Sequence, residues 1–225
     1  MNNIVSIFSC CQGTEAVYPV SFIATAIAMK KPLKKVLMVH RGYGLHKEST
    51  VRISFDRYEN IELETSGITD NLYTIHINME SGDIYSNPDE TKHFLKKIAG
   101  YFDIVICDAG NDLNKPFALG MLLESAWVLY LIDGHIESIN RYTGLMPIIK
   151  KLKIRPSGFI VDLDSCYPEY SMIHLFNRLG DESEDMTYVV CLDTGENGLN
   201  DLADDLMFFV FEYANRRKFY NREQQ

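Results

Sequence analysis

The chain has 225 residues, of which 46% are hydrophobic and 24% are charged, with a formal net charge of −9 at pH 7. These values are typical of a globular protein and exclude a disordered chain, a collagen-like repeat and a small disulfide scaffold. The acidic balance argues against nonspecific DNA binding, which needs clustered cations, and no stretch has the roughly 18 consecutive apolar residues of a membrane span.

Short apolar runs alternate along the chain with segments of helical periodicity. In chain order they predict a strand (4–8), a helix (17–31), strands (35–39 and 72–77), a helix (89–99), a strand (102–107), a helix (116–123), a strand (126–132), a helix (138–152), a strand (158–161), a helix (170–179), a strand (188–192) and a final helix (199–218). Pro19 fits the first turn of the first helix, whereas Pro147 is expected to kink or split the fourth.

Strands separated by helices imply crossover connections. The sequence therefore predicts an α/β fold, a doubly wound and mostly parallel sheet of about seven strands with helices on both faces. The strands are continuous apolar runs, as expected for strands covered on both faces. No linker divides the chain, so we expect one domain over residues 1–225, with residues 41–70 as an irregular segment or insertion.

The five cysteines are odd in number and include no C-x-x-C pair. This usage predicts free thiols in a reducing cytoplasm, used mainly as small apolar residues. No secretory signal is visible at the N-terminus, so we expect a cytoplasmic protein, with the inner face of the cell membrane as the alternative location.

The first strand, a loop over residues 9–16 and a helix beginning at Val17 form the arrangement in which P-loop proteins hold phosphate. Further segments match the motifs of one family in order and spacing: Phe22–Ala28, Lys34–His40, Tyr101–Gly110, Ser125–Leu131 and Gly158–Asp162. On these motifs the chain resembles the MinD/ParA group of P-loop ATPases over nearly its whole length. The alternative is an unrelated α/β domain whose first loop has never bound phosphate.

The departures from the family's loop, K-G-G-V-G-K-T-T, concern the groups that bind Mg-ATP. Cys11 stands at the first lysine and Ala16 at the phosphate-binding lysine. Glu15 stands at a glycine and Val17 at the hydroxyl residue that holds Mg²⁺, whereas Gly13 is retained.

Two strand ends also bear on the resemblance. Asp108 matches the family's magnesium-associated carboxylate, although it could instead accept hydrogen bonds from the backbone of Asp112 and Leu113. Asp162 stands where the family has an asparagine that contacts adenine, and His40 replaces an acidic residue.

These departures remove the positive charge that a triphosphate needs. ATP carries about four negative charges, which the loop lysine and Mg²⁺ normally offset, while a helix N-terminus contributes only about 0.3–1 kcal/mol. The sequence therefore predicts no catalytic residue, no metal and no cofactor, and at best weak nucleotide binding. The predicted vestigial nucleotide site consists of Cys11, Gly13, Glu15, Ala16, Val17, Asp108 and Asp162.

Three other features carry weaker hypotheses. Asp162 and Asp164 could act as an acid/base or metal pair, but an acidic loop is the simpler interpretation. Cys10 and Cys11 could be reactive near a helix N-terminus, but packing thiols are the simpler interpretation. The final helix has a broad apolar face, which we assign to core packing plus a partner or dimer contact. The alternative is membrane docking through this helix, which its aspartates disfavour because they would repel anionic lipids.

The leading hypothesis is a non-catalytic MinD/ParA-like protein, a pseudo-ATPase that recruits, positions or assembles partners by protein–protein contacts. The resemblance suggests an assembly or secretion machine as partner, and a homodimer, with no nucleic acid bound. The second hypothesis is a divergent ATPase that binds Mg-ATP with a cation supplied by a partner, with Arg41 and Lys47 as other cations near the site. The third is a DNA- or membrane-associated positioning protein.

Overall fold

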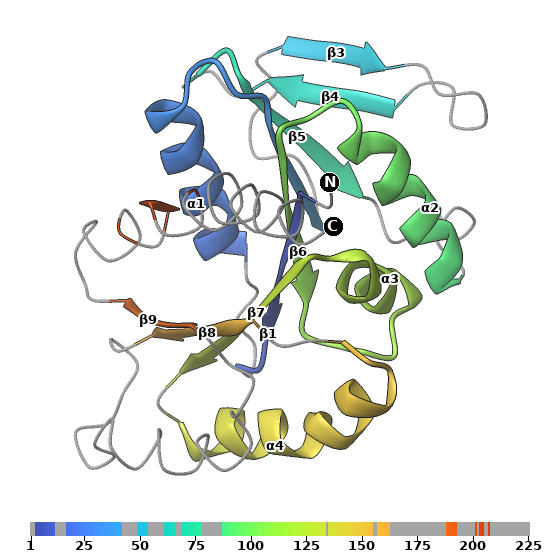
Figure 1. Ribbon diagram of the computed structural model, residues 1–225, viewed down its shortest axis with the longest axis vertical. Coiled ribbons are helices and arrows are strands. Elements are labelled where there is room, and N and C mark those ends of the chain that lie inside the picture. The colour runs from blue at the N-terminus through green and yellow to red at the C-terminus, as the bar shows by residue number, and fades with distance from the viewer. Residues whose placement is uncertain are drawn as a thin grey trace, which may run out of the picture.

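The computed structural model describes residues 3–11, 17–41, 49–53, 61–65, 69–77, 87–133, 135–154, 157–162, 188–192, 201, 203–204 and 207 (Figure 1). Within these residues, nine strands form one sheet in the order β3-β4-β5-β2-β6-β1-β7-β8-β9. Seven neighbouring strands are parallel: β5 (Leu72–Ile77), β2 (Val36–Arg41), β6 (Ile104–Gly110), β1 (Ile4–Ser9), β7 (Trp127–Asp133), β8 (Gly158–Asp162) and β9 (Tyr188–Leu192). These are the seven strands that the apolar runs predict, so the α/β fold class is confirmed.

The remaining two strands correct an expectation about residues 41–70. β3 (Ser49–Ile53) and β4 (Ile61–Thr65) pair in antiparallel fashion, and β4 continues the sheet by pairing with β5. The prediction of an irregular segment is therefore wrong for these residues. Each strand has only five residues and several polar side chains, so neither forms the continuous apolar run that identifies a buried parallel strand.

The sheet lies between two sets of helices (Figure 1). One face packs against α1 (Val17–Lys30), together with Ala203 and Met207 near the C-terminus. The other face packs against α2 (Pro88–Ala99), α3 (Pro116–Glu124) and α4 (Ile136–Lys151). Side chains of β1 alternate between the two cores, because successive residues of a strand point to opposite faces.

The helix boundaries agree with local capping chemistry. Asn87 accepts a hydrogen bond from the Glu90 backbone N–H at 2.9 Å, and Pro88 follows it in the first helical turn. By contrast, α4 continues through Pro147 and is not split there. Pro147 lies on the exposed side of α4, where water can satisfy the backbone carbonyl that proline leaves without its helical donor.

Part of the sequence prediction falls outside the described residues. The helix predicted over 170–179 lies there entirely, as does most of the one predicted over 199–218. Residues 201, 203, 204 and 207 are helical. Among the described residues, no helix combines the length and the apolar character needed to cross a membrane.

Candidate functional site

The carboxyl ends of β1, β6 and β7 lie side by side, because β1 pairs with β6 on one side and with β7 on the other. After β1 the chain continues to β2, which lies on one side of β1 in the sheet. After β6 it continues to β7, which lies on the other side of β1. This reversal of direction is the topological switch point at which open α/β sheets bind ligands. The loop that leads from β1 to α1 begins at this point, as the sequence predicts.

The predicted vestigial site is only partly within the described residues. Gly13, Glu15 and Ala16 lie outside them. Val17 is the first residue of α1, and Asp162 is the last residue of β8, in register with Asp133 of β7. The backbone thus brings two aspartates to neighbouring positions on adjacent parallel strands. Asp164, the proposed partner of Asp162, lies outside the described residues.

Asp108 is fully buried at the end of β6, and one of its carboxylate oxygens accepts the Gly110 backbone N–H at 2.8 Å. Gly110 has a φ of 68°, which favours glycine, and β6 bulges at Ala109 where its register with β1 shifts. The bulge places the Gly110 N–H within reach of the carboxylate, and the expected hydrogen bonds from the Asp112 and Leu113 backbone stay a prediction. Asp112 instead accepts hydrogen bonds from the backbone and side chain of Asn114, both at 3.0 Å.

Cys10 and Cys11 are buried thiols and not exposed nucleophiles. The Cys10 N–H donates to the Leu131 carbonyl at 2.8 Å, and the Cys11 N–H donates to the Ser9 hydroxyl at 3.2 Å. Burial, with the nearby Asp133 carboxylate, raises the pKa of the Cys11 thiol to about 12. Burial also raises the pKa of Cys10 well above its ordinary range. Both thiols therefore keep their protons near neutral pH, which favours the packing interpretation over a reactive one.

Arg141 lies at this edge of the sheet, and it is not among the site residues predicted from the sequence. It lies on α4, and its guanidinium donates hydrogen bonds to the backbone carbonyl of Cys11 at 3.4 Å and to that of Asn111. It therefore connects the start of the first loop to the loop that follows β6. The available signal was its place as the first basic residue of the helix that follows β7.

Carboxylates and cations both occur at this edge among the described residues: Asp108, Asp112, Asp133 and Asp162, with Arg41 at the end of β2, Lys115 before α3, and Arg141. Asp108 lies near the end of β6 and Asp133 ends β7, the two strands that flank β1, and the Asp133 carboxylate accepts a hydrogen bond from the His135 backbone N–H at 3.2 Å. The Arg141 guanidinium is in no ion pair among these residues, and both of its hydrogen bonds go to neutral carbonyls. No group of three or more potential metal ligands is found in the described part of the chain.

Comparisons with known proteins identify relatives only at the level of structure. No family model matches the chain, and no curated protein matches it. Among solved structures, a ParA family ATPase from Chlorobium tepidum TLS superposes with a TM-score of 0.69 at 13% identity, covering 90% of this chain and 97% of that chain.

Two MinD structures are similarly close. The MinD cell division protein of Aquifex aeolicus has a TM-score of 0.68 at 14% identity, covering 91% of this chain and 97% of its own. The septum site-determining protein MinD from Pyrococcus horikoshii OT3, complexed with Mg-ADP, has a TM-score of 0.67 at 15% identity, covering 95% and 98%. At these identities the likeness shows the fold, and this chain has the MinD/ParA-type P-loop NTPase fold over nearly its whole length.

Proposed function

We propose that this chain is a non-catalytic protein of MinD/ParA-like fold that recruits, positions or assembles other proteins. One observation carries the proposal, namely the chemistry of the switch point. Asp108, near the end of β6, and Asp133, at the end of β7, lie on the two strands that flank β1, and the guanidinium of Arg141 is held by two backbone carbonyls. The loop itself contributes no lysine, since none occurs before Lys30.

The electrostatic consequence is unfavourable for a triphosphate. In relatives of this fold the loop lysine and Mg²⁺ together offset the phosphate charge. Here the carboxylates at the strand ends would repel the phosphates, and this repulsion is strong where water is partly excluded. The Arg141 guanidinium contacts the backbone of Cys11, at the start of the first loop, which supports a role for this side chain in positioning the chain at that point.

A fluorescent ATP analogue with Mg²⁺ tests the proposal directly. The wild-type chain is expected to show no saturable binding at micromolar concentrations, while the Pyrococcus horikoshii MinD serves as a positive control. The variant Glu15→Gly/Ala16→Lys/Val17→Thr restores three of the family's loop residues, the phosphate-binding lysine among them, and is expected to gain binding. Micromolar affinity of the wild type, lost in Asp108→Asn, would contradict the proposal.

The protein-contact part needs its own experiment. Affinity purification of the chain from its native cell, followed by mass spectrometry, should recover a defined set of proteins from one assembly or secretion machine. Repeated purifications that recover no specific protein would count against a recruiting role even if the chain binds no nucleotide.

A divergent ATPase is the second candidate, and Arg141 is the observation that favours it. A guanidinium at the switch point is a cation of the chain's own, and it could turn from the two carbonyls toward a phosphate. This candidate predicts phosphate release above background that is lost in both Arg141→Met and Asp108→Asn. Absence of phosphate release from the wild type excludes it.

A further inference from the structure

The turn between α1 and β2 presents apolar and basic side chains together at the amino edge of the sheet. Its sequence is Lys30-Lys31-Pro32-Leu33-Lys34-Lys35. Leu33 is 95% exposed, and Tyr101, in the neighbouring loop after α2, is 55% exposed. Lysines at a helix end are explained by the helix dipole, but that dipole does not explain an exposed leucine and tyrosine beside them.

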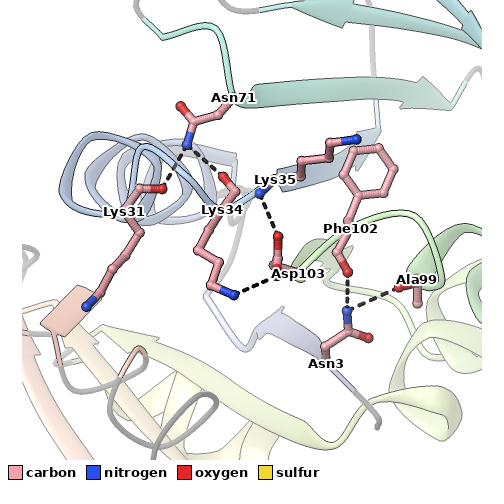
Figure 2. Close-up of polar contacts among 8 residues, drawn as sticks. All are labelled: Asn3, Lys31, Lys34, Lys35, Asn71, Ala99, Phe102 and Asp103. Carbon is pink, nitrogen blue, oxygen red and sulfur yellow. Dashed lines mark hydrogen bonds and ion pairs between the residues drawn. The ribbon is translucent and has the colours of Figure 1, made fainter.

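The turn is held in one conformation by two polar side chains (Figure 2). The Asn71 amide nitrogen lies within hydrogen-bond distance of three backbone carbonyls of this region, at 3.0, 3.1 and 2.7 Å, belonging to Ala28, Lys31 and Lys34. The Asp103 carboxylate accepts the Lys34 ammonium and the Lys35 backbone N–H, both at 2.9 Å. These contacts fix the backbone of the turn in a conformation that exposes Leu33. Because the turn is already ordered, little conformational entropy is lost when it binds a surface.

Two of the four lysines are available to an anionic partner. Lys30 pairs with Asp204 at 2.6 Å and Lys34 pairs with Asp103. Lys31 and Lys35 are exposed and enter no ion pair among the described residues, and Figure 2 shows their ammonium groups pointing away from each other.

We propose that the amino-edge patch, consisting of Lys31, Leu33, Lys35 and Tyr101, docks the protein onto an anionic lipid bilayer. Leu33 would enter the interfacial region, with the lysine ammonium groups at the level of the headgroups. Tyrosine is favoured at the same level. A lipid surface fits better than a protein partner, because lysine is depleted in protein–protein interfaces.

The proposed docking is weak and oriented. Asp70 lies beside Asn71 at the same edge and offsets part of the lysine charge, so binding depends on Leu33 as well as on the lysines. With the amino edge on the membrane, the opposite edge with Asp108 and Arg141 faces away from it and stays open to partners. The docking is independent of whether that edge binds nucleotide.

Sedimentation of the full-length chain with lipid vesicles tests the proposal. We expect retention on vesicles of phosphatidylglycerol and phosphatidylcholine at low salt, and little on phosphatidylcholine alone or at high salt. Leu33→Ser should lower the partition coefficient about tenfold, and Leu33→Phe should preserve it. Replacing Lys31 and Lys35 by glutamine should lower it about fivefold per lysine.

The charge control is Lys92→Gln/Lys115→Gln, which makes the same change in net charge on α2 and at the start of α3 and also removes the surface ion pair of Lys92 with Asp89. This variant should bind like the wild type. The proposal is overturned if no vesicle retains the wild type at low salt, or if the control weakens binding as much as the patch variants. Binding to polyglutamate in preference to vesicles, lost in the Lys31/Lys35 variant, would identify an acidic protein partner and would also overturn it.

Discussion

The contacts of Arg141 should stabilise the folded chain, and their removal is the most informative single change. A hydrogen bond that involves a charged group contributes about 1.5–3 kcal/mol. Arg141 makes two such contacts with described residues, but one is long at 3.4 Å and the side chain is partly exposed. We therefore expect Arg141→Met to lower the free energy of unfolding by about 2 kcal/mol, a fall in Tm of about 4–8 °C.

Urea unfolding followed by tryptophan fluorescence measures this effect, because Trp127 on β7 is the only tryptophan of the chain. Amide hydrogen exchange should also accelerate around Cys11 and Asn111, whose carbonyls lose their donor. Lys151→Met likewise replaces a cationic side chain by methionine, at an exposed position of α4, and should alter stability by less than about 0.5 kcal/mol. If Arg141→Met changes neither the free energy of unfolding nor the amide exchange around Cys11 and Asn111, the idea that α4 holds the start of the first loop is wrong.

The remaining predictions concern packing and titration. Gly120→Ala should lower the free energy of unfolding by about 1–3 kcal/mol, because a Cβ there would lie 2.5 Å from the Thr91 Cβ. Gly144→Ala meets nothing within 4 Å and should raise the free energy of unfolding by about 0.5–1 kcal/mol. Urea unfolding measures both changes. Stability should fall as pH rises from 9 toward 12, because the unfolded chain loses the Cys11 proton near its ordinary pKa of 9.0 while the folded chain keeps it to about 12. Cys11→Ala should make this fall shallower, and an unchanged slope would contradict the assignment. The buried Cys107 should resist alkylation until the chain is unfolded, as mass spectrometry of iodoacetamide-treated protein can check.

The proposed function and the proposed membrane contact concern different edges of the sheet and can be tested separately. The first concerns the carboxyl edge of the sheet and is tested with nucleotide and with partner proteins. The second concerns the amino edge and is tested with lipid alone. A chain that binds vesicles and also binds Mg-ATP would refute the first proposal and support the second.

Local patterns in the sequence were sufficient for the alternation of strands and helices, and with it the parallel sheet and the MinD/ParA-type fold. Buried parallel strands are continuous apolar runs, and helices show their own periodicity, so each can be recognised without knowing its neighbours. The short polar strands β3 and β4 lack that signal, since their pairing depends on the β5 edge and not on their own composition.

The contacts that define the candidate site depend on the tertiary structure. Arg141 and Cys11 are 130 residues apart in the chain and meet only because α4 packs beside the central strands. The hydrogen bond from the Gly110 N–H to Asp108 forms at a bulge in β6, and the low reactivity expected of Cys11 follows from its burial. The sequence by itself therefore determined which groups the first loop lacks, while only the folded chain decided which groups surround it, because long-range packing leaves no local pattern.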